Sequence, residues 1–260
     1  MYSSHLLSTV WSGHPVGFDL LTHGDYQFAA FYDADRNMTV ASRHLGSTDW
    51  TLAHPQGVWL EQRGRLSSQL AWDSHNYVTL AIDSLGYLHL SGNMHVDPLI
   101  YFRTTKPLDV TTFERVDFMT SEIETRCTYP VFITGPAGEL VFRYRDGSSG
   151  NGNDHYNIYD PQTRTWRSLL DQPLTDGQDL MNAYATRPLL GPDGWYHMNW
   201  VWRDTPDCAT NHDLSYARSR DLVHWETSEG RPLPLPITIE SGAIIDPVPA
   251  GAGISTRCSP

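Results

Sequence analysis

Basic side chains are scarce in this sequence, and lysine is nearly absent. The 260 residues contain 18 Lys and Arg against 30 Asp and Glu, so the formal net charge is −12, and Lys106 is the single lysine. This balance argues against a nucleic acid or a membrane surface as the main partner, because both are anionic. An anionic ligand would have to be held by a local group of arginines, whose planar guanidinium groups suit carboxylates.

Cysteines, helical periodicity and long apolar runs are also scarce. The cysteines are too few and too scattered for a disulfide framework: Cys127, Cys208 and Cys258. No apolar stretch reaches the roughly 20 residues that a membrane-spanning helix needs. Residues 1–15 lack the basic start and the apolar centre of a signal peptide. The sequence therefore predicts a soluble, β-rich chain.

Aromatic residues, in contrast, are plentiful, and they recur in a long repeat. The 9 Trp and 13 Tyr suit both flat packing between sheets and the binding of sugars. Four times a short strand reaches a turn rich in Gly, Asn or Asp and returns through an aromatic-rich strand. The turns end at positions 37, 86, 138 and 194, which are 49, 52 and 56 residues apart.

This spacing predicts a β-propeller. A period of about 40 to 50 residues is typical of a propeller blade with four strands. A β-sandwich would turn about every 8–12 residues without a longer period. The copies also end alike, with an Asp or Ser turn before an aromatic residue that would pack between blades: Trp50, Trp166 and Trp225. We expect an all-β fold of about four antiparallel blades with four strands each.

The predicted blades divide the chain into six parts. The blades cover, in order, about residues 19–60, 61–120, 121–175 and 176–230. Residues 1–18 are interpreted as the strand remnant of a preceding blade, with one strand over Leu6–Trp11. Residues 231–260 form a Pro- and Gly-rich tail, either the start of a missing blade or a non-native end. Four blades leave sheet faces uncovered, so a fragment of a longer propeller is favoured over pairing with a second copy.

Propeller geometry predicts that side chains from several blades meet at one mouth. The innermost hairpin of each blade begins and ends at the same end of the channel. Counted from the turn glycine, one group lies nine or ten residues before it: Tyr77, Tyr129 and Tyr184. A second group lies seven or nine residues after it: Arg145, His95 and Arg203. We expect one cluster of the following residues: His75, Tyr129, Tyr184, His95, Arg145 and Arg203.

Three further features are weighed beside this cluster. Arg143 would share the strand face of Arg145, but the spacing favours Arg145. The Gly-, Ser- and Asn-rich loop 147–153 is interpreted either as a rim or lid over the site or as a plain connector. Cys208 and His212 are two ligand types that a structural Zn²⁺ prefers, and Ca²⁺ is a second candidate ion. The alternative for them is a buried thiol beside a hydrogen-bonded histidine.

Several motifs give the chain a family resemblance. They include Trp72-Asp73-Ser74-His75-Asn76-Tyr77, Gly92-Asn93-Met94-His95, Phe142-Arg143-Tyr144-Arg145-Asp146-Gly147 and Trp202-Arg203-Asp204-Thr205-Pro206. With them the chain resembles the BNR-4 repeat proteins over residues 20 to about 228. That group includes seven-bladed propeller polysaccharide lyases of the ulvan lyase and rhamnose–glucuronate lyase types. The resemblance implies an extracellular lyase of an anionic polysaccharide, with blades beyond those present here and no cofactor in catalysis.

The resemblance also implies which residues form the site. In those lyases two His, a Tyr and an Arg from different blades surround a uronate. The resemblance puts them on His75, His95, Tyr129 and Arg145, with a second Tyr at Tyr184. Further substrate contacts are expected from neighbouring positions in the same motifs: Asn76, Arg143 and Arg203.

The chemistry of β-elimination explains these residue types. The reaction removes the C5 proton of a uronate and expels the oxygen on C4, and C5 is a weak acid while the carboxylate stays negative. Arg145, helped by His95, would stabilise the charge that develops on the carboxylate. His75 and Tyr129 would supply the base and the acid, in an order that stays open. A cation such as Arg145 would lower the pKa of Tyr129 from its ordinary value.

Two other functions stay open at this point. A sialidase-like glycoside hydrolase would need a pair of carboxyl groups. Asp73, Asp146 and Asp204 are available for it, although each lies in a motif that reads as structural. The other alternative is a non-catalytic carbohydrate-binding propeller, an inactive fragment, because the sequence resembles only part of a longer enzyme.

Overall fold

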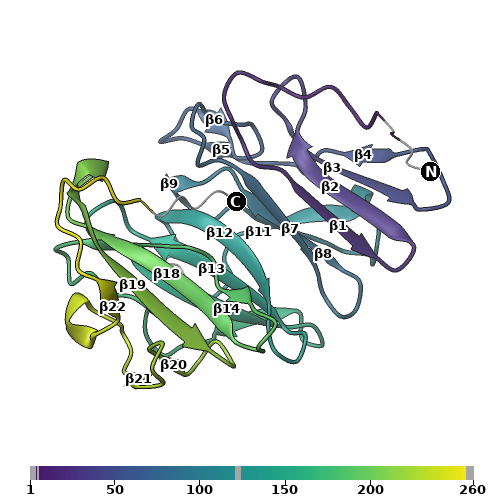
Figure 1. Ribbon diagram of the computed structural model, residues 1–260. Helices are drawn as coiled ribbons and strands as arrows, with labels where there is room; N and C mark the ends of the chain where they lie inside the picture. The colour runs from purple at the N-terminus through teal and green to yellow at the C-terminus, as the bar shows by residue number, and fades with distance from the viewer. Residues whose placement is uncertain (1–3, 5, 121–123, 256–260) are drawn as a thin grey trace.

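The regular secondary structure of the protein consists almost wholly of antiparallel β-strands (Figure 1). The computed structural model describes residues 4, 6–120 and 124–255. In these residues four larger sheets follow one another along the chain, accompanied by a two-stranded hairpin and three short 3₁₀ helices. The predicted all-β class is confirmed, and each larger sheet contains one of the four predicted turns.

The first two sheets have four strands each. The first has the order β1 (Asp19–His23), β2 (Tyr26–Tyr32), β3 (Met38–His44) and β4 (Thr51–Ala53). The second has the order β7 (Val78–Ile82), β8 (Leu88–Gly92), β10 (Tyr101–Thr104) and β11 (Phe113–Val116). Three small elements accompany them: β5 (Trp59–Leu60), β6 (Arg65–Leu66) and the 3₁₀ helix η1 (Val110–Thr112).

The third sheet borrows a strand from the second copy of the repeat. Four of its strands are consecutive: β12 (Cys127–Thr134), β13 (Leu140–Asp146), β14 (Asn153–Asp160) and β15 (Thr165–Ser168). The fifth is β9 (His95–Asp97), which leaves the second sheet between β8 and β10 and pairs with β12. This crossover places His95 opposite Thr128, and therefore beside the start of β12.

The fourth sheet incorporates much of the predicted tail. Its main path is β16 (Asn182–Ala185), β18 (Tyr196–Arg203), β19 (Asn211–Ser219), β20 (Trp225–Glu226) and β21 (Pro232–Leu233). Two more strands pair with it from the side: β17 (Leu189–Leu190) with β18 and β22 (Ile244–Asp246) with β19. The remaining 3₁₀ helices are η2 (Cys208–Thr210) and η3 (Ile239–Ser241). The tail therefore continues this sheet, a pairing that its irregular sequence did not predict.

The N-terminal segment differs from its prediction. The strand expected over Leu6–Trp11 is absent, and only Val10 forms an isolated bridge, with Asp33 at the end of the first hairpin. The segment thus pairs with a turn that follows it in the chain. Among the described residues no helix is both long enough and apolar enough to cross a membrane.

The turns of the repeat form where the sequence predicts them. In the first, the Arg36 N–H donates to the Asp33 carbonyl over 3.0 Å. In the others Gly86, Gly138 and Gly194 donate to the carbonyl three residues earlier over 3.0, 3.0 and 3.1 Å. Each of these glycines has a positive φ, between +76° and +86°, which other residues adopt only with strain. The glycines therefore set the repeat locally.

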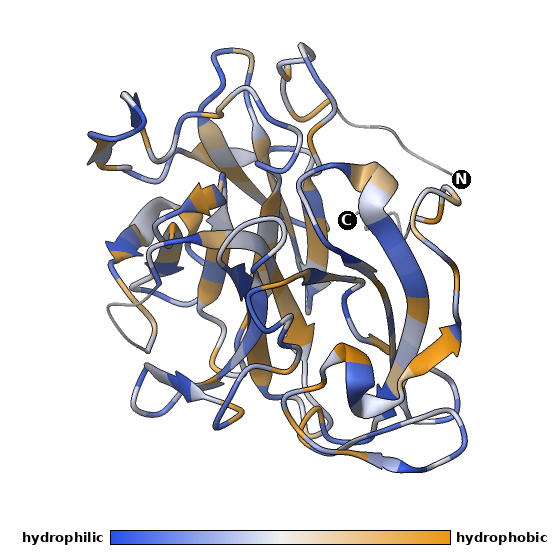
Figure 2. Cartoon of the chain, turned by 90° about the vertical axis from the view of Figure 1, so that its left-hand side faces the viewer, coloured by the Kyte–Doolittle hydropathy of each residue, from blue (hydrophilic) through white to orange (hydrophobic). Residues whose placement is uncertain are grey.

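Two apolar cores lie on opposite faces of the third sheet. Neighbouring residues of β12 and β13 alternate between them, so that Phe132 and Phe142 face one core while Ile133 and Val141 face the other. The first core joins the first three sheets, and the second joins the third and fourth. Most apolar strand segments accordingly lie in the middle of the molecule, as Figure 2 shows. Trp166 and Trp225 are buried in these cores, as their place after an Asp turn predicts.

Candidate active site

The structure brings most of the predicted site residues into one connected group. The imidazole rings of His75 and His95 stack with centroids 4.2 Å apart. His75 lies 5.5 Å from the ring of Tyr129, and Tyr129 lies 6.4 Å from the ring of Tyr184. The guanidinium carbon of Arg145 is 4.9 Å from the ring centre of Tyr129. These side chains come from β9, β12 and β13 of the third sheet, from β16 of the fourth, and from the loop that leads into β7 of the second.

An irregularity in β12 directs Tyr129 into the group. The register between β12 and β13 shifts between Thr128 and Val131, which marks a β-bulge. Tyr129 adopts a φ of +58° within this bulge, a left-handed conformation that is uncommon for a bulky residue. Bulges bend a strand and re-aim a side chain, and they occur often next to active sites. The backbone strain at Tyr129 thus supports a functional reason for its position.

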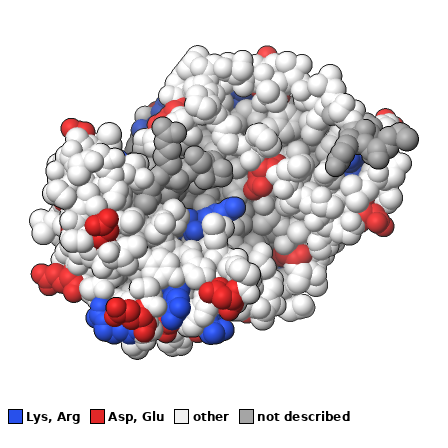
Figure 3. Space-filling view, viewed as in Figure 1, with Lys and Arg blue, Asp and Glu red and all other residues white. Residues whose placement is uncertain are grey.

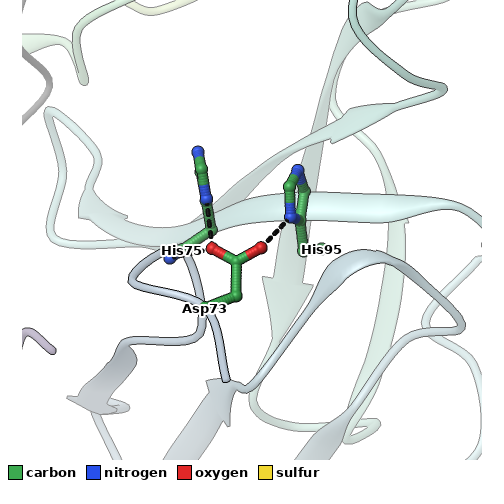
Figure 4. A group of neighbouring side chains, drawn as sticks. All are labelled: Asp73, His75 and His95. Atoms are coloured by element: carbon green, nitrogen blue, oxygen red, sulfur yellow. Dashed lines mark hydrogen bonds and ion pairs between the residues drawn. The ribbon is translucent and has the colours of Figure 1, made fainter. Parts of the chain in front are cut away.

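Asp73 joins the two histidines, as Figure 4 shows. One of its carboxylate oxygens lies 2.5 Å from Nδ1 of His75 and also accepts the main-chain N–H of His75 over 2.9 Å. The other oxygen accepts a short hydrogen bond from Nδ1 of His95. Partial burial alone would raise the pKa of Asp73, but these hydrogen bonds lower it to about 2. Asp73 is therefore ionised at neutral pH.

The surroundings of His95 lower its pKa, so that it takes up a proton less readily than an ordinary histidine. Burial is the main cause that lowers the pKa of His95, and the positive charges of His75 and Arg145 add to it. The hydrogen bond with Asp73 acts in the opposite direction and does not outweigh them. Histidine ordinarily titrates near pH 6.5. His95 is thus a neutral imidazole at neutral pH.

Arg145 lies beneath the tyrosines rather than at the surface. Only 1% of it is exposed, and its guanidinium is also near the ring of Tyr184, at 5.8 Å. One nitrogen donates to Thr128 Oγ1 over 3.2 Å, while Nε and Nη1 have no hydrogen-bond partner among the described residues. Gly152 makes room for the side chain, because an added Cβ there would lie 2.6 Å from Arg145 Cδ. The structure therefore holds a buried cation with unused donors at the site.

Tyr184 and the loop 147–153 form the edge of the group. The hydroxyl of Tyr184 lies 2.6 Å from Ser149 Oγ in that loop. The guanidinium carbon of Arg203 stacks 3.7 Å from the centre of the Tyr184 ring, and Arg203 Nε donates to Asn211 Oδ1 over 2.7 Å. The loop thus contacts the predicted site directly, which favours its interpretation as a rim over that of a plain connector.

Two predicted substrate contacts lie inside the protein. Arg143 is 3% exposed and forms an ion pair of 2.7 Å with the buried carboxylate of Asp154. Asn76 is 1% exposed, and its carbonyl accepts the hydroxyl of Tyr32 over 2.7 Å. Neither side chain is presented at the surface beside the histidines. The spacing of residues in the sequence could not show that the guanidinium of Arg143 is already paired with the carboxylate of Asp154.

The predicted metal pair, Cys208 and His212, stays a prediction, and the structure shows carboxylate partners for its histidine. Cys208 is exposed, so it is not the buried thiol of the alternative. Both ring nitrogens of His212 are occupied, Nε2 by Asp204 at 3.0 Å and Nδ1 by Asp213 at 2.9 Å. Within the described ranges, the group of three potential metal ligands is Asp73 with His75 and His95. Cys127 is free and buried, and Cys258 lies outside the described residues.

The surface beside β9 is hollowed by a groove that the site side chains do not line, and basic and acidic groups are mixed on the face that Figure 3 shows. A groove of about 420 Å³ lies beside β9, and Val96 next to His95 is part of its lining. The other lining residues include Trp59, Arg63, Pro98 and Arg126. On the face in Figure 3 basic and acidic side chains are interspersed, and a basic group lies in the central hollow. This face has no broad basic patch of the kind that nucleic acids require.

Solved structures share this fold. A polysaccharide lyase, Uly1, superposes with a TM-score of 0.70 at 18% identity, over 95% of this chain and 62% of that one. A PL25 ulvan lyase gives a TM-score of 0.65 at 18% identity, over 90% and 57%. The same type of lyase bound to -[GlcA(1-4)Rha3S]- gives 0.64 at 18% identity, over 90% and 57%. At this identity the likeness shows the fold, and the chain spans about three fifths of these proteins.

Sequence comparison gives the family. No curated protein shows a significant match to the chain. The sequence pattern described as BNR repeat-containing family member, however, matches residues 26–259, which is nearly the whole chain. The chain therefore belongs to the BNR repeat-containing family.

Proposed function

We propose that this protein is a polysaccharide lyase that cleaves a uronate-containing glycan by β-elimination. The observation that carries the proposal is the joining of His75, His95, Tyr129 and Arg145 in one group. Two imidazoles and a phenol that can exchange protons there adjoin a buried cation whose charge no carboxylate neutralises among the described residues. A base, an acid and a fixed positive charge are the requirements of the reaction.

Proton transfer would be divided between His75 and Tyr129. Their rings are 5.5 Å apart, so a sugar placed over both could meet one of them at C5 and the other at the C4 oxygen. Removing the C5 proton leaves its electron pair to form the C4–C5 double bond, and the C4–O bond breaks. The departing oxygen takes a proton from the acid. The products are an unsaturated uronate and a new hydroxyl end.

Arg145 would act from below this pair. Because it is covered by the rings of Tyr129 and Tyr184, a direct contact with the uronate carboxylate would need one ring to move. Without such a movement its charge still stabilises a phenolate on Tyr129, since attraction through a dry interior is stronger than in water. The carboxylate itself would be met by His95, the half-exposed imidazole on the other side of His75, which would take up a proton on Nε2 as the negative charge of the carboxylate approaches.

A glycoside hydrolase fits the site less well. Hydrolysis of that kind uses one carboxyl group as an acid and a second as a nucleophile or base. The pKa of Asp73 is about 2 because its hydrogen bonds outweigh its burial, so it carries no proton to donate at neutral pH. Asp204 is bound to His212. The carboxylates of Asp73 and Asp204 therefore serve histidines, which favours the lyase.

The comparisons guide the choice of substrate. One of the similar structures holds a glucuronate–rhamnose-3-sulfate glycan, and we propose a related anionic glycan for this chain. Tyr184, stacked on Arg203 and bonded to Ser149, would provide a flat surface for a sugar ring beside the reacting uronate.

The proposal is tested by incubating the 260-residue chain with a glycan of that repeat. We expect ultraviolet absorbance from the unsaturated uronate, together with new reducing ends. Tyr129→Phe and His75→Ala should each abolish this signal without unfolding the protein. Tyr216→Phe is the matched control, because Tyr216 also contacts a histidine, His197 over 2.6 Å, but outside the site.

Three outcomes of this assay would contradict the proposal. New reducing ends without absorbance would show a hydrolase. Binding of the glycan without any product would show a carbohydrate-binding protein. Full activity in both site variants would remove the assigned mechanism.

A further inference from the structure

We propose that Asp73 is a positioning residue that fixes both site imidazoles in one tautomer, with the proton on Nδ1 and a bare lone pair on Nε2. The inference deepens the proposed function, on which its catalytic consequence rests. Its structural part stands on the hydrogen bonds alone.

The hydrogen-bond chemistry determines the tautomer. An ionised carboxylate can only accept hydrogen bonds, so each nitrogen that contacts Asp73 must carry the proton. Both contacts are made by Nδ1, of His75 to one oxygen and of His95 to the other. In a neutral imidazole the other nitrogen, Nε2, is then an acceptor. One acidic side chain therefore sets the protonation pattern of two histidines.

The geometry directs both lone pairs to the same side. The two rings stack with an angle of 22° between their planes, and each directs its Nδ1 toward the carboxylate of Asp73. Figure 4 shows their far ends, which carry Nε2, pointing away from the carboxylate of Asp73. The side chains of His75 and His95 are 37% and 35% exposed, and their Nε2 atoms have no hydrogen-bond partner among the described residues. The open face of the pair thus presents two proton acceptors.

Asp73 is itself held in place. The oxygen that contacts the imidazole of His75 also accepts the main-chain N–H of that residue over 2.9 Å. The loop thereby fixes the carboxylate, and the carboxylate fixes a ring on its own loop and a ring on β9. In many sites, a carboxylate that hydrogen-bonds to one nitrogen of a functional histidine orients the ring in this way.

A metal ion is the competing interpretation of the same three residues. A metal needs lone pairs that converge on one point at about 2.0–2.1 Å from each nitrogen. Nearly parallel rings instead direct their Nδ1 lone pairs side by side, and both Nδ1 atoms already contact Asp73. The arrangement fits a hydrogen-bond bridge better than an ion site.

The tautomers can be measured by two-bond ¹H–¹⁵N correlation spectra of protein labelled with ¹⁵N-histidine. At a pH high enough that both imidazoles are neutral, we expect the Nδ1–H form at both His75 and His95, with the signals assigned from His75→Ala and His95→Ala. In Asp73→Asn the amide offers one acceptor and one donor, so one ring should change to the Nε2–H form. Asp193→Asn, beside His197, is the matched control and should leave both signals unchanged.

Several results would overturn the inference. They are an Nε2–H form at either ring in the native protein, unchanged tautomers in Asp73→Asn, or stoichiometric Zn²⁺ binding that perturbs both rings and requires Asp73. These readouts need no turnover, so they separate this inference from the proposed function. If the lyase signal is present, Asp73→Asn should reduce kcat by about 100-fold or more and change its pH profile, with a smaller effect on KM.

Discussion

Two histidine clusters in this protein contain the same residue types and differ in what they leave open. His89 in β8 is fully buried, with Nδ1 at 2.6 Å from the Tyr101 hydroxyl and Nε2 at 3.4 Å from Asp83. His75 and His95 each contact a carboxylate through Nδ1 only, and they are half-exposed. Both clusters also include a tyrosine ring within 6 Å of a histidine ring.

The difference separates a structural histidine from one that can act on a ligand. When both ring nitrogens are occupied, as in His89, the imidazole links strands and has no site left for a proton from outside. When Nε2 is open, the imidazole can accept or donate a proton there. The arginines of β13 show the same contrast, because Arg143 is paired with Asp154 and Arg145 is not paired with a carboxylate.

Removing one histidine from each cluster should separate activity from stability. His75→Ala should reduce turnover by about 10²–10⁴-fold with little change in Tm, because a partly exposed proton carrier is lost. His89→Ala should lower the free energy of unfolding by about 2–4 kcal/mol, since it leaves a cavity and two buried polar groups unpaired. Lyase rates and thermal denaturation check both. Equal effects of the two variants on Tm would contradict the distinction.

The two arginines give a second pair of variants. Arg145→Met should reduce turnover by about 10²–10³-fold while stability stays the same or rises, because a buried cation without a carboxylate partner is removed. Arg143→Met should lower the free energy of unfolding by about 3–5 kcal/mol, because it leaves Asp154 buried and charged. Denaturant unfolding measures both. Strong destabilisation by Arg145→Met would show that its charge has a partner that this account misses.

Two glycines test whether the position of Arg145 matters. Gly152→Ala should lower turnover by about 10–100-fold, because the new Cβ would displace Arg145. Gly138→Ala adds a Cβ with nothing within 4 Å, but at a φ of +86°, so it should cost about 1 kcal/mol of stability and no activity. Comparison of the two rates distinguishes displacement at the site from general backbone strain.

The pH dependence of His95 and His212 should differ in sign. Burial lowers the pKa of His95, with the charges of His75 and Arg145 adding to this, although Asp73 opposes it. Burial also acts to lower the pKa of His212, but Asp213 and Asp204 raise it overall. The contribution of His95 to stability is complete above about pH 6.5 and is lost as the pH falls through its lowered pKa. The contribution of His212 to stability is complete below about pH 6.5 and is lost as the pH rises through its raised pKa.

This difference is measured by NMR titration of the two imidazoles. The midpoint of His95 should lie below that of His212. His212→Gln serves to assign the signals. The reverse order would contradict the charge pattern described for the active site.

Local sequence features predicted the turns, because Gly86, Gly138 and Gly194 determine them within four residues. The meeting of His75, Tyr129 and Tyr184 followed from the period of the repeat and from the family resemblance. The role of Asp73 could not be predicted in this way. It depends on β9, which leaves the second sheet and brings His95 beside the loop that contains Asp73. A crossover of three residues leaves no periodic signal.

The spacing of residues in the sequence also could not predict which of the candidate side chains are buried. Spacing favoured Arg145 over Arg143, but it could not show that the carboxylate of Asp154, eleven residues beyond Arg143, pairs with Arg143 inside the protein. The covering of Arg145 by Tyr129 depends on the bulge and on a positive φ in β12. Pro130 lies in the bulge and is the one residue that could have marked it, because proline within a strand is typical of edges and bulges. The positive φ of Tyr129 has no glycine to mark it.

The central claim is that this group of side chains performs an elimination rather than a hydrolysis. The most direct test is the mass of the oligosaccharides that the 260-residue chain releases from a glucuronate–rhamnose-3-sulfate glycan. The account predicts fragments whose new non-reducing end is lighter by one water than a hydrolysis product, and none from Tyr129→Phe. Fragments that carry the added water would contradict it.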